Sequence, residues 1–217
     1  MYQKILPLTS LFITLGFFIG CGNMETTSSS QTIKLRAGTP SEENHKKAEV
    51  SFRDLNFTQA LVYDKAQLKE DLNYFREQSA EIALDYNNIA LDYAKLKEFN
   101  QSLELYKKVI AIDDTVFERN STERATTFYN IASTYEALTN YKEAHNYYLK
   151  SVKIDKNREK LLISYQDIAR VNSYEGNNKE ALLYYQKARN MALSLNKNEI
   201  TIAVIEEAIA DVKKRMQ

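Results

Sequence analysis

The stretch DYNNIALDYAKLKEFNQSLELYKKV, residues 85–109, decides the fold. Its first part places apolar or small side chains at i, i+3, i+4 and i+7, the spacing of one helix face: Tyr86, Ile89, Ala90 and Tyr93. Ala90 and Ser102 then lie twelve positions apart, with a short turn segment between the two apolar runs. Small residues at two such positions let antiparallel helices approach closely, so the stretch predicts a helix–turn–helix pair.

Pairs of small residues twelve positions apart recur along the chain: Ala48 and Ala60, Ala90 and Ser102, Ala132 and Ala144, Ala169 and Ala181. The first members of these pairs are 42, 42 and 37 residues apart. The aromatic residue of the first helix recurs with them, as Tyr86, Phe128 and Tyr165. Repetition at such a period is typical of an array of stacked, similar units.

Helix-breaking residues are almost absent from the repeated region. Residues 41–217 contain no proline and one glycine, Gly176. Since Pro and Gly interrupt helices, their absence over this length predicts an all-α fold. Gly176 itself lies where a helix should end, at a position that favours a residue tolerant of positive φ.

The repeated pattern resembles the tetratricopeptide repeat, in which an aromatic, a Leu–small pair and a Tyr mark the first helix. A small residue, an aromatic and a second small residue mark the second helix of that family. The resemblance implies an α-solenoid of antiparallel helix pairs, with a degenerate repeat at 41–82, repeats at 83–124, 125–161 and 162–198, and a capping helix at 199–217. The capping helix is expected because Ile202, Ile205, Ile209 and Val212 form one apolar stripe.

The 42-residue spacing is longer than the common 34 residues of this family. Kinesin light chains and several bacterial peptide-sensing regulators use such longer repeats. Eight further residues correspond to about 12 Å of helix. Residues 111–125 are expected to form an extended connection between repeats, with Ser121 as an N-cap.

The N-terminal residues are typical of an export signal. One Lys precedes a largely apolar run, residues 5–20, which is too short and too interrupted for a comfortable membrane span. The run ends in Phe18-Ile19-Gly20-Cys21, which resembles the lipobox of bacterial lipoproteins. The resemblance implies a signal peptide at 1–20, lipidation of Cys21, and a flexible tether at 21–40. An uncleaved membrane anchor and a buried core cysteine are the alternatives.

Peptide-binding arrays of this family carry their ligand in a concave groove lined by the first helices. The resemblance places ten residues of three successive repeats there: Asn87, Asn88, Leu91 and Lys95, then Tyr129, Asn130 and Ser133, then Gln166, Asp167 and Arg170. Asn88 and Asn130 share one repeat position, and an Asn amide can both donate to and accept from a peptide group. Ordinary polar residues facing water are the alternative interpretation, and only Lys95 and Arg170 could capture a carboxylate.

The remaining features predict no catalysis, cofactor, metal or nucleic acid. Net charge is zero, and one Cys and two His cannot build a zinc site. His45 and His145 are expected to be solvated, as are the adjacent carboxylates Asp113 and Asp114. Seven tyrosines are expected in the repeat core: Tyr86, Tyr93, Tyr106, Tyr135, Tyr148, Tyr165 and Tyr185. Four others are expected to be free for binding: Tyr129, Tyr147, Tyr174 and Tyr184.

Together these observations predict a membrane-tethered scaffold of a bacterial cell envelope, which binds an extended peptide or partner helix and is not an enzyme. An input module of a signalling system, with its output in a partner protein, is one alternative. A structural lipoprotein of envelope assembly, which uses its outer surface, is another.

Overall fold

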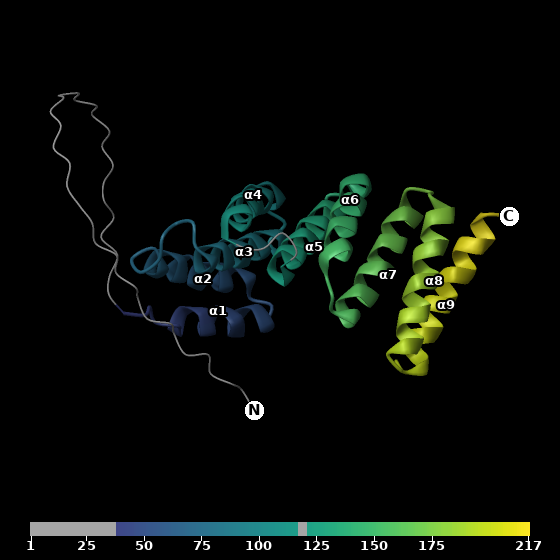
Figure 1. Ribbon diagram of the computed structural model, residues 1–217, viewed down its shortest axis with the longest axis horizontal. Helices are drawn as coiled ribbons and strands as arrows, with labels where there is room; N and C mark the ends of the chain where they lie inside the picture. Colours follow the sequence, from purple (N-terminus) through teal and green to yellow (C-terminus); the bar gives the residue numbers. More distant parts are fainter. Residues whose placement is uncertain (1–37, 117–120) are drawn as a thin grey trace, which may run out of the picture. The chain divides into compact units, whose positions relative to one another are not determined.

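A computed structural model describes residues 38–116 and 121–217 (Figure 1). Within these ranges the chain forms nine α-helices and no strand, which confirms the predicted all-α class. The helices are α1 (Glu43–Arg53), α2 (Phe57–Asp71), α3 (Ala80–Lys95), α4 (Phe99–Val116), α5 (Thr122–Ala137), α6 (Tyr141–Ile154), α7 (Arg158–Tyr174), α8 (Asn178–Ser194) and α9 (Glu199–Arg215). The predicted signal peptide, Cys21 and most of the predicted tether lie outside the described residues.

The helices pack in sequence order, each mainly against its neighbours along the chain. Four pairs form, α1 with α2, α3 with α4, α5 with α6, and α7 with α8, and each second helix also packs on the next first helix (Figure 1). Helix α9 packs on α8. Such nearest-neighbour packing defines an α-solenoid.

The paired small residues lie where the helices of each pair meet. Ala48 is 3 % exposed, and the other seven members of the four pairs have no exposed surface. A larger side chain at any of these positions would push the paired helices apart. The bulkiest buried side chains, Tyr106 and Tyr148, fill the space beside them.

The turn within each pair has the same geometry in all four pairs. The seventh residue after the first small residue has positive φ in each: Leu55 (61°), Lys97 (63°), Thr139 (58°) and Gly176 (78°). The next backbone N–H donates to the carbonyl five residues earlier in every case, at 2.8–2.9 Å. This is a Schellman C-cap, and Gly176 meets the expectation of a positive-φ residue.

The connection between α4 and α5 is shorter than predicted. Residues 111–116 continue α4, and α5 begins at Thr122, so the segment 111–125 is helical at both ends. The extra repeat length therefore lies largely in α4, which has 18 residues against 14 in α6. Ser121 does cap α5, because its hydroxyl accepts a bond from the Arg124 N–H at 3.1 Å.

Helix α9 covers the last pair with the apolar stripe that the sequence predicts. Ile205 and Val212 are buried, and Ile202 and Ile209 pack partly buried beside them. Its outer side carries charged residues, and three basic residues lie in its last turn. Positive charge there complements the helix dipole.

The tyrosine assignments are wrong in part. Tyr184, predicted to be free, is only 8 % exposed and packs against Tyr165. Tyr185, predicted to be in the core, is half-buried and packs against the core as predicted. Tyr147 is also packed, with its ring stacked on Tyr135. The prediction treated adjacent tyrosines as one inside and one outside, but both can pack where a helix has neighbours on two sides.

Candidate protein-interaction surface

The predicted groove residues lie on one side of α3, α5 and α7, which we call the first-helix surface. Lys95, Ser133 and Arg170 are exposed, and Asp167 is buried. The remaining six are half-buried: Asn87, Asn88, Leu91, Tyr129, Asn130 and Gln166.

An amide pair joins α3 to α5 on this surface. The Asn130 side-chain amide donates to the Asn87 side-chain oxygen at 3.2 Å. Asn88 and Asn130 share the repeat position that was predicted to bond a peptide ligand. The Asn130 amide is instead bonded to Asn87 of the preceding repeat. Asn88 instead lines a cavity beside α1, which leaves it the better placed of the two to meet a ligand.

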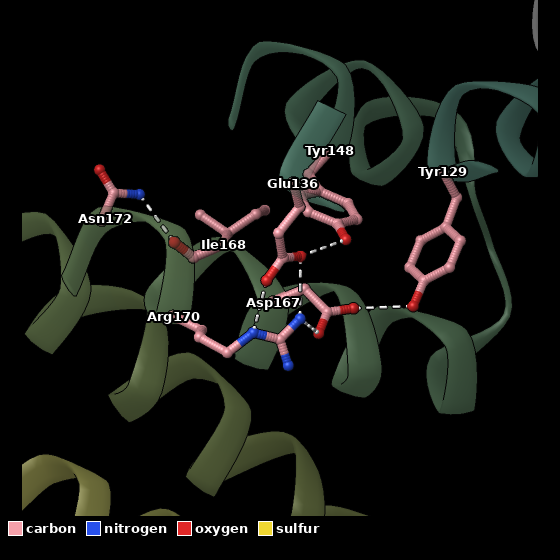
Figure 2. Close-up of polar contacts among 7 residues, drawn as sticks. All are labelled: Tyr129, Glu136, Tyr148, Asp167, Ile168, Arg170 and Asn172. Carbon is pink, nitrogen blue, oxygen red and sulfur yellow. Dashed lines mark hydrogen bonds and ion pairs between the residues drawn. The ribbon is translucent and has the colours of Figure 1, made fainter. Parts of the chain in front are cut away.

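Five polar residues form a connected network between α5, α6 and α7 (Figure 2). Arg170 donates to both carboxylate oxygens of Glu136, at 2.7 and 2.9 Å, and also pairs with Asp167 at 2.8 Å. The Tyr129 hydroxyl donates to the other Asp167 oxygen at 2.7 Å, and the Tyr148 hydroxyl donates to Glu136 at 2.8 Å. Two carboxylates thus surround one guanidinium.

The network removes three predicted groups from ligand binding. Tyr129 is not free, because its hydroxyl is held by Asp167 and its ring packs beside Tyr148. Asp167 is buried and already accepts from two partners, so it is no acceptor for a ligand N–H. Burial raises the pKa of Asp167, while Tyr129 and Arg170 act in the opposite direction. Arg170 is already paired with carboxylates, which argues against capture of a ligand carboxylate there.

A second polar contact replaces an expected aromatic residue. Asn172, at the position where the other repeats carry Tyr93 and Tyr135, is 2 % exposed. Its amide donates to the Ile168 carbonyl at 2.8 Å (Figure 2) and lies 2.7 Å from the His145 Nδ1. His145 is therefore half-buried and bonded, and the expectation of a solvated side chain is wrong.

Three cavities follow one another between successive first helices. The α1–α3 cavity, about 360 Å³, is lined by α1 residues together with Asp64, Asn88 and Leu91. The α3–α5 cavity, about 300 Å³, includes Leu84 and Asn87. The α5–α7 cavity, about 150 Å³, is lined by six residues: Thr126, Tyr129, Asp155, Lys160, Ile163 and Ser164.

Apolar side chains are exposed along this row at one repeat position. Leu84 and Ile163 each lie six residues before the first small residue of their repeat, and they are 53 % and 49 % exposed. Thr126 is the equivalent residue in the repeat between them. An apolar side chain that is half-exposed beside a cavity can gain from contact with a partner.

Two pairs of buried aspartates lie between α2 and α3, and sequence reasoning missed them. Asp64 faces Asp92, and Asp71 faces Asp85, all less than 10 % exposed. Burial, followed by repulsion from the facing carboxylate, raises the pKa values of Asp85 and Asp92 to about 8. Their spacing in the sequence indicates the arrangement, because on each helix the two aspartates are seven residues apart and so share a face.

Asp113 is buried, contrary to the prediction. It was predicted to be solvated at a helix end, but it is 1 % exposed beneath the α3–α5 cavity. Burial raises its pKa to about 6, and the nearby Arg124 limits the rise. Asp114 is exposed as expected, and it pairs with Arg124 at 2.6 Å.

Two kinds of feature are absent from the part of the chain that the structure describes. No helix among them has the length and apolarity needed to cross a membrane. In the same ranges, no three His, Cys, Asp or Glu side chains gather closely enough to hold a metal ion.

The packing and the first-helix surface define the class as an α-solenoid of stacked helix pairs. Comparison with known proteins identifies the repeat type, since residues 78–157 match the tetratricopeptide repeat family. Residues 78–157 therefore carry tetratricopeptide repeats, as predicted. No curated protein matches the sequence.

Solved structures share this fold at low sequence identity. One is a Podosopora anserina protein described as a kinesin light chain with nearly identical TPR-like repeats (TM-score 0.70, 16 % identity, covering 80 % of this chain and 85 % of that one). BtubC (BKLC) from P. vanneervenii gives 0.64 and 16 %, covering 81 % and 75 %. MamA gives 0.52 and 15 %, covering 80 % and 86 %. At such identity these likenesses establish the fold alone.

Proposed function

We propose that this protein is a membrane-tethered scaffold of a bacterial cell envelope, which binds an extended segment or helix of a protein partner along its first-helix surface. The fold supports the scaffold role, because tetratricopeptide-type solenoids are protein-interaction scaffolds and are typically not enzymes. The row of three cavities between successive first helices supports binding along the first-helix surface.

The surface offers two kinds of contact to such a partner. Leu84 and Ile163 provide exposed apolar area at equivalent positions, and Asn88 provides an amide that can bond a peptide group. Single hydrogen bonds contribute only about 0.5–1.5 kcal/mol net, so apolar contact must supply much of the affinity. Glu136, Arg170 and Asp167 join α5 to α7, and the Tyr148 hydroxyl ties α6 to Glu136, so little ordering of these helices is needed on binding.

Replacing exposed apolar residues with glutamate on the two sides of the solenoid tests which surface binds the partner. Leu84→Glu and Ile163→Glu should abolish co-purification of the partner from cells, because each places a carboxylate in the contact. Leu183→Glu is the matched control, since Leu183 is 42 % exposed on the second helix α8. Loss of the partner with the control alone would show that the outer surface is used and would refute the proposal.

The tether is tested separately, at Cys21. We expect metabolic incorporation of a palmitate analogue into the intact protein and its loss in Cys21→Ala. The support for this is the Phe18–Cys21 motif at the end of an apolar run. An intact protein that stays unlabelled would contradict the lipid anchor and leave the scaffold proposal standing.

A further inference from the structure

The α1–α3 cavity differs from the other two in having a buried, unpaired carboxyl pair in its wall. Asp64 lines this cavity and is 7 % exposed, and Asp92 lies behind it with no exposed surface. Among the described residues, no Lys or Arg forms an ion pair with either side chain. Neither Asp92 oxygen has a donor from any other described residue.

Two carboxyl groups in such a place can face each other only if they share a proton. Asp92 then donates to Asp64, and burial together with the negative charge of Asp64 raises the pKa of Asp92 to about 8. One negative charge is left, without a partner, in the cavity wall. An unpaired buried charge is costly, so a cation that reached Asp64 would bind with the benefit of pairing it.

The rest of the cavity wall suits an alkyl chain that ends in a cation. Phe52 supplies a ring, which is held by an edge contact with Phe57 at 5.2 Å between centroids. Leu91 supplies apolar surface, and Asn88 supplies an amide from the first-helix surface. A ring and a carboxylate in one cavity are the two groups that lysine and arginine side chains bind best.

Other charged groups near the pair do not satisfy it. On α1, His45 and Glu49 line the cavity. Burial raises the pKa of Asp64, and His45 acts in the opposite direction with a smaller effect. Arg53 is paired with Glu49 at 3.6 Å at an exposed position. On α4, Tyr106 approaches Asp92 but carries no charge. The second carboxyl pair, Asp71 with Asp85, adds further negative charge along the same helix interface.

We propose that the α1–α3 cavity binds the cationic side chain of a lysine or arginine in the partner's segment, with Asp64 as its counter-ion. The inference rests on the proposed function and specifies the chemistry of the partner. The side chain brings one positive charge, which pairs the one negative charge of the two carboxyl groups, and the shared proton stays on Asp92.

Short peptides test the cavity directly. The probes are Ac-Ser-Ala-Lys-Ala-Ser-NH₂ and the same peptide with norleucine in place of lysine, which keeps the alkyl chain and removes the charge. The lysine peptide should shift the NMR signals of the Asn88 side-chain amide and of the His45 ring in a saturable manner. Asp64→Asn should weaken binding at least about tenfold, and Asp211→Asn, at an exposed position of α9, should not.

Calorimetry adds a second measurement that does not depend on the Asp64 variant. In two buffers of different ionisation enthalpy, binding of the lysine peptide at pH 6 should release no proton, because its cation pairs Asp64 and the shared proton stays on Asp92. Release of a whole proton would contradict this arrangement. Equal binding of the norleucine peptide, or full binding by folded Asp64→Asn, would overturn the inference. Tighter binding of spermidine than of the lysine peptide would overturn the assignment to a protein segment.

The cation pocket and the first-helix surface can fail independently of each other. A protein partner whose binding is lost with Leu84→Glu but is unchanged by Asp64→Asn would refute the cation pocket alone. If the lysine peptide binds the cavity but Leu84→Glu and Ile163→Glu leave partner binding unchanged, the proposed binding surface is refuted and the cation pocket is not.

Discussion

Replacing Asp85 with Asn should change how the stability of the protein depends on pH. Asp85 is 5 % exposed and faces Asp71, so burial and then that carboxylate raise its pKa from 3.8 to about 8. The unfolded chain ionises Asp85 near pH 4. Unfolding therefore releases a proton above that pH, and the fold loses stability as the pH rises from about 4 to about 8.

The size of the effect follows from the pH interval. Three pH units, from 5 to 8, correspond to about 4 kcal/mol for a lone group. The Asp71–Asp85 pair holds one proton in the folded state and none in the unfolded chain over most of this interval, so we expect nearly the full loss, about 4 kcal/mol. Asn is neutral throughout, and Asp85→Asn should escape this loss. Its stability relative to the unsubstituted protein should therefore rise by about 4 kcal/mol between pH 5 and pH 8.

Urea unfolding followed by circular dichroism at 222 nm measures the difference at each pH. Repeat arrays can unfold in parts, so hydrogen exchange of α2 and α3 amides should report opening of this interface separately. Asp211→Asn, at an exposed position, is the control and should show no pH-dependent difference. A constant difference between Asp85→Asn and the unsubstituted protein at pH 5 and pH 8 would mean that the pair is ionised, and the reasoning would fail.

Three further substitutions test the packing and the caps, each by the free energy of unfolding in urea. Tyr148→Phe should cost about 1.5–3 kcal/mol, because it removes a buried hydrogen bond to a carboxylate; no loss would mean that the bond is not formed. Ala132→Leu should cost about 1–3 kcal/mol by overpacking the fully buried helix crossing, whereas Ala137→Leu, at an exposed position, should cost little. Ser121→Ala should cost about 1 kcal/mol by removing the α5 cap, and exposed Ser133→Ala should be nearly neutral, so equal losses would contradict the cap.

The fold could be predicted because its determinants are local and repeated. The spacing of small residues fixes where two helices of a pair meet, and every one of those residues is buried. The absence of Pro and the single Gly176 fix the class in the same way. These signals depend on residues within one repeat, which the sequence displays side by side.

The sequence predicted which residues lie on the first-helix surface but not which residues they bond. The partners of Tyr129 and Asn130 lie 38 and 43 residues away along the chain. Contacts at such separations depend on how one repeat rotates against the next, and the periodicity of a single helix carries no information on that rotation. The same limit explains why Asp64 and Asp92 were overlooked: each looks like an ordinary helix-surface residue until the helices are placed together.

The shared turn of the four pairs has a consequence for protein engineering. Leu55, Lys97 and Thr139 adopt the left-handed conformation with a Cβ atom present, whereas Gly176 adopts it without one. A residue with a side chain is less favourable there by on the order of 1 kcal/mol. The chain therefore holds three unused opportunities for thermostabilisation, in turns outside both the first-helix surface and the helix crossings. Glycine at these three turns should raise the stability of the solenoid without changing the first-helix surface.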